Sequence, residues 1–91
     1  MTKTIIITGA SQGIGKATAE TFLKAGWIVG CLARNGDKLA ALCDGKEAAI
    51  PLAADVADSA AVDAAFAGFV EKTGRIDALF NNAGRGSAAA T

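Results

Sequence analysis

Near its N-terminus the chain carries the segment Thr8-Gly9-Ala10-Ser11-Gln12-Gly13-Ile14-Gly15, which lies between two stretches of different character. The β-branched run 4–7 before it is typical of a buried parallel strand. Residues 16–25 after it are mostly good helix formers, and Gly26 is a typical residue just beyond a helix C-terminus. A strand that passes through a glycine-rich turn into a helix is the usual context of phosphate binding, because the helix N-terminus presents unpaired N–H groups and a partial positive charge. The segment therefore predicts a backbone cradle for a pyrophosphate, which side chains at the glycine positions would block.

The same turn has two competing interpretations. Gly15-Lys16 superficially resembles the end of a P-loop, but that motif needs a glycine five positions before the Gly-Lys pair and Ser or Thr after the lysine. Ala10 and Ala17 stand at those places, which excludes a P-loop. The glycines could also be plain turn residues, but the strand–turn–helix context favours a binding turn.

Size and charge narrow the possible functions. The 91 residues make one small domain at most, and the 52% hydrophobic content is rich in alanine, so the core is modest. The formal net charge of zero argues against nucleic acid or an anionic membrane surface as a partner. No apolar run is long enough to cross a bilayer, and Met1-Thr2-Lys3 leads into the first strand rather than into a signal peptide. We therefore expect a cytoplasmic protein.

The cysteines carry no metal signature. Cys31 and Cys43 lack Cys-x-x-Cys spacing, and the sequence contains no histidine that could join them at a metal, so we expect no metal site. In a reducing cytosol we expect both thiols to stay free, with a disulfide or redox role as the less favoured alternative.

The rest of the chain alternates apolar runs with helical patterns. The runs predict strands at 27–32, 48–53 and 76–80, with helices starting near Asp37 and over 59–72. Asn35 and Asp58 are candidate helix caps, and Pro51 places the third strand at an edge because proline cannot donate to a sheet ladder. The predicted fold is a doubly wound parallel α/β sheet, βαβαβαβ, with strand order 3-2-1-4. The second helix is expected to bury Leu39, Leu42 and Cys43, and the third is expected to pack on the sheet through Val62, Ala65, Phe66, Phe69 and Val70.

Two motifs in order carry a resemblance to a known family. Thr-Gly-x-x-x-Gly-x-Gly over 8–15, followed by Asn81-Asn82-Ala83-Gly84 after the fourth strand, resembles the short-chain dehydrogenase/reductase family. The resemblance covers residues 4–84 and corresponds to the N-terminal, cofactor-binding portion of a member. It implies a Rossmann-type fold and an NAD(P)(H)-dependent oxidoreductase that interconverts an alcohol and a ketone. Residues 1–91 are then expected to be this cofactor-binding part, with 85–91 as a loop or frayed end.

The resemblance and the residues together predict a binding site. The pyrophosphate is expected on the glycine turn, the adenine beside Asp55 and Val56, and the nicotinamide-side ribose against 82–84, while Asn81 stabilises the central sheet. No carboxylate stands between Gly30 and Gly36, so Arg34 is expected to bind a ribose 2′-phosphate with no acid competing, which favours NADP(H) over NAD(H). The expected cofactor-binding residues are Gly9, Ser11, Gln12, Gly13, Ile14, Gly15, Arg34, Asn35, Asp55, Val56, Asn82, Ala83 and Gly84.

Plainer interpretations of these residues remain open. Arg34 could be a solvated loop charge, and Gln12 is neutral where many NADP-preferring relatives carry a basic residue. Asp55 could simply end a strand, and Asn and Gly after the fourth strand could form a tight turn.

The sequence contains no tyrosine and no histidine, so we expect no catalytic residue within it. In the family the proton donor is a tyrosine assisted by a lysine four residues later, so the catalytic half is expected to be absent from these residues. The complete protein is expected to act on a small alcohol or carbonyl substrate and to form a homo-oligomer. One alternative is a non-catalytic dinucleotide-binding module that self-associates through the exposed edge of the fourth strand. A sugar-nucleotide epimerase-like relative ranks last, because its glycine turn has two residues between successive glycines.

Overall fold

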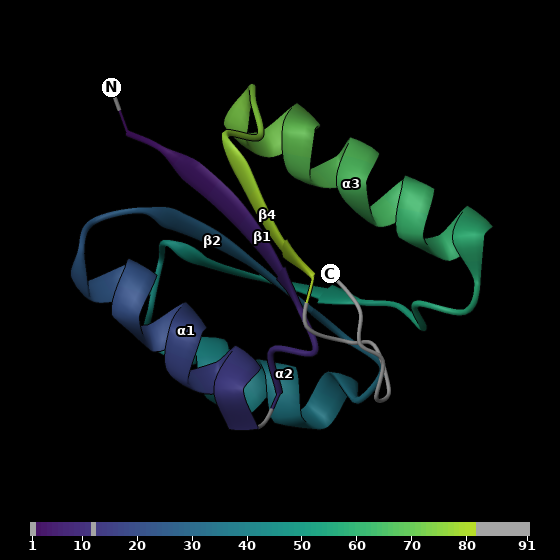
Figure 1. Cartoon of the computed structure of the whole chain (residues 1–91), viewed down its shortest axis with the longest axis horizontal. Helices are drawn as coiled ribbons and strands as arrows, with labels where there is room; N and C mark the ends of the chain where they lie inside the picture. The colour runs from purple at the N-terminus through teal and green to yellow at the C-terminus, as the bar shows by residue number, and fades with distance from the viewer. Residues whose placement is uncertain (1, 12, 82–91) are drawn as a thin grey trace.

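A computed structural model describes residues 2–11 and 13–81 of the chain (Figure 1). The described part alternates strands and helices from end to end. Its elements are β1 (Thr4–Thr8), α1 (Gly13–Lys24), β2 (Ile28–Ala33), α2 (Gly36–Cys43), β3 (Ala49–Ala53), α3 (Ser59–Thr73) and β4 (Ala78–Asn81). The predicted segment 85–91 lies outside the described residues.

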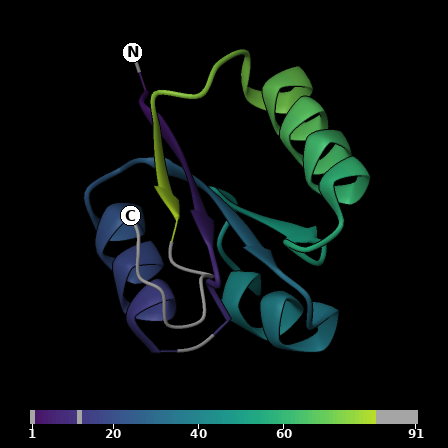
Figure 2. The same cartoon turned by 45° about the vertical axis from the view of Figure 1, so that its right-hand side comes forward.

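The strands form one parallel sheet in the order β3-β2-β1-β4, which confirms the predicted α/β fold and topology. Helices α1 and α2 cover one face of the sheet and α3 covers the other (Figure 2). β3, with the exposed Pro51, lies at one edge as expected, and β4 lies at the opposite edge. A parallel sheet between helix layers explains why β1 is buried along its whole length.

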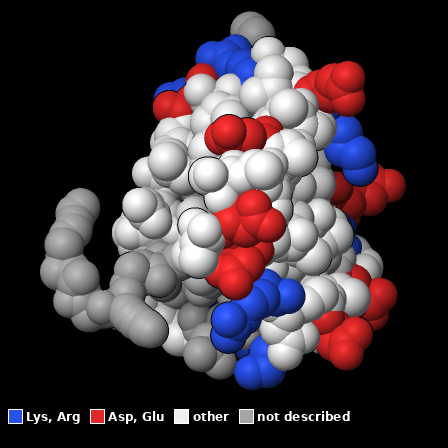
Figure 3. Space-filling model, turned by 90° about the vertical axis from the view of Figure 1, so that its right-hand side faces the viewer, with Lys and Arg blue, Asp and Glu red and all other residues white. Residues whose placement is uncertain are grey.

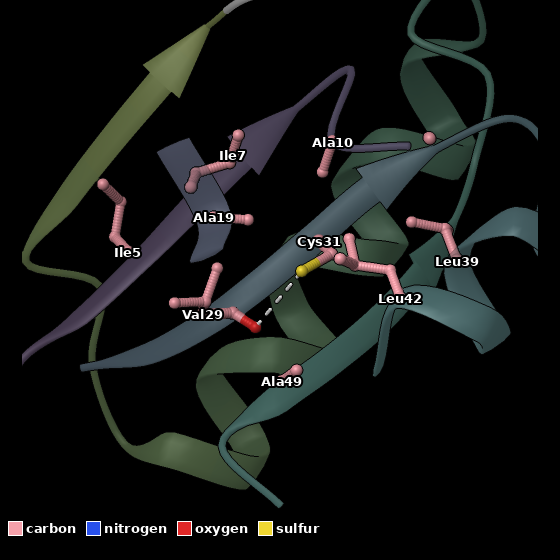
Figure 4. Close-up of a cluster of buried hydrophobic side chains, with 10 residues drawn as sticks. Ile5, Ile7, Ala10, Ala19, Val29, Cys31, Leu39, Leu42 and Ala49 are labelled. Carbon is pink, nitrogen blue, oxygen red and sulfur yellow. Dashed lines mark hydrogen bonds between the residues drawn. The ribbon is translucent and has the colours of Figure 1, made fainter. Parts of the chain in front are cut away.

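The core on the side of α1 and α2 is built from alternate residues of the two central strands. Ile5 and Ile7 of β1 and Val29 and Cys31 of β2 share this face, as expected from the two-residue period of a strand (Figure 4). The helices contribute small and branched side chains to the same cluster, namely Ala19 from α1 and Leu39 and Leu42 from α2. Leu39 and Leu42 are buried and Cys43 is half-buried, which confirms the predicted apolar stripe of α2.

The core on the α3 side is smaller and centres on one aromatic ring. Phe69 is fully buried and packs with Ile6, Leu32 and Leu52. A Cβ atom built on Gly30 of β2 would lie 2.8 Å from Cε1 of Phe69 and 3.0 Å from Cδ1 of Leu52. Gly30 is therefore the residue that lets the Phe69 ring approach the sheet backbone.

The predicted packing face of α3 is partly wrong. Val62, Ala65 and Phe66 are half-buried, but Val70 is 39% exposed. Successive helical residues are rotated by about 100°, so with Phe69 aimed at the sheet, Val70 reaches the rim of the contact. Leu79 of the edge strand β4 is also 50% exposed, because α3 does not cover that side of the sheet fully.

Helix ends follow the predicted chemistry. The Asn35 side chain accepts a hydrogen bond from Lys38 N at 3.1 Å and caps α2, and Asp58 accepts from Ala61 N at 3.2 Å and caps α3. Gly74, at φ 88°, ends α3 in the left-handed conformation. The helix α1 begins at Gly13, three residues before the predicted start, so the glycine turn itself opens the helix. Among the described residues, no helix is both long and apolar enough to span a membrane.

Candidate functional site

Two glycines of the glycine turn adopt a backbone conformation that favours glycine. Gly9 and Gly13 have φ of 66° and 61°, in the left-handed region where a side chain is strained. Ala10 N donates to Leu32 O at 3.2 Å, which ties the turn to the end of β2. A Cβ on Gly13 would meet nothing within 4 Å, so the space beside the first residue of α1 is open. The turn thus presents an accessible helix N-terminus, the geometry that suits an anion.

The sheet brings the ends of its strands to one edge. Thr8 of β1 is in register with Leu32 of β2 and with Asn81 of β4. The ends of β2 and β3 are also in register with each other. The glycine turn, Arg34 and Asp55 therefore follow the carboxyl ends of neighbouring strands, where open parallel sheets bind ligands. Four predicted site residues lie outside the described part of the chain: Gln12, Asn82, Ala83 and Gly84.

A hydrogen bond ties β1 to β4 at this edge. The hydroxyl of Thr8, which is 5% exposed, donates to Oδ1 of Asn81 at 3.0 Å. This contact agrees with the expected role of Asn81 in stabilising the central sheet.

The structure corrects the expectation that no acid competes for Arg34. Nη1 of Arg34 lies 3.8 Å from Oδ2 of Asp55, an ion pair that joins the ends of β2 and β3. The side chains are 82% and 45% exposed, so the pair is worth only about 0–1 kcal/mol. Acidic and basic groups lie close together on the side shown in Figure 3, where solvent and salt screen them. The guanidinium of Arg34 is therefore coupled to a carboxylate but still accessible to a ligand.

Asp55 and Asn35 both hold local backbone structure. Oδ1 of Asp55 accepts from Ala57 N at 2.9 Å, a turn that begins as β3 ends, so the strand-ending role is real. Its Oδ2 is the atom that faces Arg34. Oδ1 of Asn35 is used by the α2 cap. Of the predicted apolar contact residues, Ile14 is 69% exposed and Val56 is 45% exposed beside the same edge.

Comparison with known proteins identifies the family. The family model described as short chain dehydrogenase matches residues 3–91. The chain belongs to the short-chain dehydrogenase family. It is 41% identical over 87 residues to a sulfoacetaldehyde reductase of Chromohalobacter salexigens, covering 92% of this chain and 34% of that protein. The chain thus spans about a third of the length of this curated relative.

Solved structures of the family have the same fold. A 3-ketoacyl-(acyl-carrier-protein) reductase from Brucella melitensis, complexed with NADH, superposes with a TM-score of 0.82 at 35% identity, over 85% of this chain and 32% of that one. An L-sorbose reductase from Gluconobacter frateurii, complexed with NADPH and L-sorbose, superposes with a TM-score of 0.85 at 37% identity, over 94% and 35%. Relatives of this chain therefore include proteins solved with either nicotinamide cofactor.

Sequence reasoning missed a groove between α1 and α2. It has a volume of about 380 Å³ and begins at Ser11 of the glycine turn. Its lining is Ser11, Lys16, Glu20, Lys38, Ala41, Leu42 and Lys46. The one available signal was that Lys16 and Lys38 both stand in the first turn of a predicted helix.

The two thiols of the chain are not activated for chemistry. Cys31 and Cys43 are both free thiols in the structure. Burial, and after it the neighbouring Cys43, raises the pKa of Cys31 to about 12. Burial also raises the pKa of Cys43. A neutral thiol is a poor nucleophile, so neither cysteine is a candidate catalytic residue. Among the described residues, no group of three His, Cys, Asp or Glu could hold a metal ion.

Proposed function

We propose that this chain is the dinucleotide-binding part, over residues 1–91, of an NADP(H)-preferring oxidoreductase that interconverts an alcohol and a carbonyl compound. The observation that carries the proposal is the geometry of the glycine turn. Gly9 and Gly13 have positive φ, and the turn leads into α1 at the same edge of the sheet as the exposed Arg34. The space beside Gly13 is open, and a side chain at this position would obstruct a pyrophosphate. The residues present therefore fit a dinucleotide. Membership of the short-chain dehydrogenase family supports the reaction class.

Each part of the cofactor has a proposed contact. Backbone N–H groups of the turn 9–15 would bind the pyrophosphate, with Ser11, Gln12, Ile14 and Gly15 contributing from within that turn. Arg34 and Asn35 would face the adenosine ribose, Asp55 and Val56 the adenine, and Asn82, Ala83 and Gly84 the nicotinamide-side ribose. When bound, the nicotinamide supplies a hydride to the substrate carbonyl or takes one from the alcohol.

The preference for NADP(H) follows from charge. A ribose 2′-phosphate needs cations, and Arg34 at the end of β2 offers a planar, permanently charged guanidinium that is 82% exposed. No carboxylate follows β2 before α2 to accept the ribose hydroxyl of NAD(H). NADH-bound relatives exist in the family, so the choice rests on this charge argument.

The cellular location and the oligomeric state of the protein are also proposals. Two free thiols support a reducing, cytoplasmic location. Leu79 on the edge strand β4 is 50% exposed, and apolar strand edges are usually covered, so we propose that further polypeptide packs there, within a homo-oligomer.

The proposal is tested on the full-length protein by binding and turnover. We expect NADPH to bind more tightly than NADH, and Arg34→Gln to weaken NADPH binding by about 10-fold or more with little effect on NADH. Equal losses for both cofactors would refute the 2′-phosphate role. Loss of the 340 nm absorbance of NADPH over a panel of ketones and aldehydes would establish the reaction class.

A second candidate is a dinucleotide-binding module without catalysis. Residues 1–91 contain no tyrosine or histidine and so no match to the family's proton donor, and by themselves they are expected to bind the cofactor without turnover. Tight NADPH binding with no turnover on any carbonyl would support this alternative against the oxidoreductase.

A further inference from the structure

We propose that Cys31 and Cys43 form an oxidisable thiol pair, which a hydroperoxide converts into a disulfide between β2 and α2. The pair lies in the core beneath α2, outside the residues proposed to bind the cofactor. It is therefore a modification site that the proposed function does not use, and its chemistry does not depend on which cofactor the protein binds.

The two thiols meet at the interface between the sheet and α2. Cys31 lies on the face of β2 that α1 and α2 cover, in the same buried cluster as Leu42 of α2 (Figure 4). Cys43 is the last residue of α2 and packs against this cluster. A hydrogen bond joins the two thiol groups. Sulfur atoms in such contact need only a small shift to reach the bond length of a disulfide.

The two thiols differ in their access to solvent. Cys31 is fully buried, so a dissolved oxidant does not reach it, whereas Cys43 is half-buried at the end of α2. Burial raises the pKa of Cys43, while the hydrogen bond with Cys31 and then the ammonium group of Lys46 act in the opposite direction. Lys46 is held beside this helix end, because its Nζ donates to Leu42 O at 3.0 Å. Cys43 is therefore the thiol that meets the hydroperoxide.

The reaction proceeds in two steps. In the first, the sulfur of Cys43 attacks hydrogen peroxide, the O–O bond breaks, and Cys43 becomes a sulfenic acid while water leaves. The sulfur loses two electrons, which reduce the peroxide. In the second, the sulfur of Cys31 attacks the sulfenic sulfur, an S–S bond forms, and the hydroxyl group leaves with the proton of Cys31 as water. Two thiols and one peroxide thus give one disulfide and two waters.

Contact between the thiols offsets the weak nucleophilicity of Cys31. Its pKa of about 12 leaves roughly one molecule in 10⁵ as thiolate at pH 7. A well-oriented group that already touches its reaction partner has an effective concentration of about 10⁵–10⁸ M. The second factor compensates for the first, so Cys31 is inert towards solutes and still reacts with an oxidised Cys43.

The buried partner protects Cys43 from irreversible oxidation. A sulfenic acid without a neighbouring thiol is carried by further peroxide to sulfinic and sulfonic acids, which do not return to the thiol. A disulfide is instead restored by thiol exchange, for example with dithiothreitol. Removing Cys31 is therefore expected to change the chemical product at Cys43 and not only its rate of formation.

The test maps the oxidation products of the native full-length protein after treatment with hydrogen peroxide at neutral pH. Remaining thiols are blocked with iodoacetamide, and the tryptic peptides are analysed by mass spectrometry. Trypsin cleaves after lysine and arginine, which places Cys31 in peptide 25–34 and Cys43 in peptide 39–46. We expect these two peptides to be joined with the loss of two hydrogen atoms, and to separate again after treatment with dithiothreitol.

Two variants distinguish a thiol pair from single reactive cysteines. In Cys31→Ala, which keeps a small apolar side chain in the core, we expect no joined peptide and Cys43 recovered as sulfinic or sulfonic acid. In Cys43→Ser we expect Cys31 to remain a thiol, because it is fully buried. Circular dichroism checks the folding of both variants. The wild-type product and Cys43→Ser decide the proposal even where Cys31→Ala does not fold.

Several results would overturn the thiol pair. One is a wild-type protein in which Cys43 becomes a sulfinic acid while Cys31 stays a thiol. Others are a disulfide between two copies of the chain, seen as a dimer on a non-reducing gel, and native protein in which neither cysteine is oxidised although the urea-unfolded protein reacts. Oxidation of Cys31 in Cys43→Ser would show that the peroxide reaches it directly, and would contradict the order of the two steps. All of these results leave the proposed cofactor binding untouched.

Discussion

Arg34 Nη1 lies 3.8 Å from Asp55 Oδ2, so the residue proposed for the 2′-phosphate is paired with the residue proposed for the adenine. A carboxylate at this point repels a phosphate group and offsets part of the positive charge of the guanidinium. Replacing Asp55 by Asn removes that charge and keeps Oδ1, which accepts from Ala57 N. We therefore expect Asp55→Asn to raise the ratio of NADPH to NADH affinity by about two- to fivefold, the range of an exposed ion pair.

The ratio is the informative quantity, because a lost adenine contact would weaken both cofactors alike. Asp63→Asn, at an exposed position of α3, is the control for the change in net charge and is expected to leave the ratio unchanged. A ratio that stays constant in Asp55→Asn would show that this carboxylate does not oppose the 2′-phosphate.

Gly30 is predicted to be intolerant of any side chain. Its Cβ would lie 2.8 and 2.9 Å from ring atoms of Phe69, which is fully buried and cannot move aside freely. We expect Gly30→Ala to lower the free energy of unfolding by about 1–3 kcal/mol, measured by urea denaturation. Gly68→Ala is the matched control: its Cβ meets nothing within 4 Å, and alanine favours the helix, so stability should be unchanged or up to about 1 kcal/mol higher. Equal behaviour of the two variants would contradict the close packing at Gly30.

Asp77 is expected to make stability depend on pH in the acid range. Thr4 N donates to its Oδ2 at 2.8 Å, and this bond, followed by the contacts of Arg75, holds the pKa of Asp77 below its usual value despite some desolvation. A lowered native pKa stabilises the fold above the unfolded pKa, about 3.9, and that contribution disappears as the pH falls through the native pKa. Urea denaturation from neutral pH down to about pH 2 should show this loss in the wild type.

In Asp77→Asn we expect lower stability at neutral pH and a flatter pH dependence below about pH 4. Asp63→Asn again serves for comparison, since that exposed residue lies in α3, away from the Thr4 contact. Parallel pH profiles for Asp77→Asn and the wild type would argue against a role for the Thr4–Asp77 contact.

Cys31 is predicted to be inert in the native protein. It is fully buried in β2, and its pKa of about 12 leaves it as a thiol throughout the physiological range. We expect iodoacetamide to label half-buried Cys43 before Cys31, and both only slowly, with mass spectrometry identifying the sites. Labelling in urea provides the reference, where the two cysteines should react alike. Faster native labelling of Cys31 would mean that β2 is open to solvent.

Most of the fold was predictable because local patterns determine local structure. The run 4–7 is β-branched, so it forms β1. Asn35 and Asp58 cap α2 and α3 because their side chains accept hydrogen bonds from backbone N–H groups. The start of α1 was misplaced because glycines at its first turn look like loop residues, although the helix begins at Gly13. The exposure of Val70 was not predicted, because the spacing of apolar residues along a helix does not indicate where the sheet beneath that helix ends.

The sequence alone determined the glycine turn, the alternation of strands and helices, and the cations available to a nucleotide, because each depends on residues close together in the chain. Only the tertiary structure decided which charges meet. Arg34 faces Asp55 because β2 and β3 end in register, and Lys38 shares a groove with Ser11 because α1 and α2 pack on the same face of the sheet. Contacts between distant residues depend on strand register and helix packing, which local propensities do not encode.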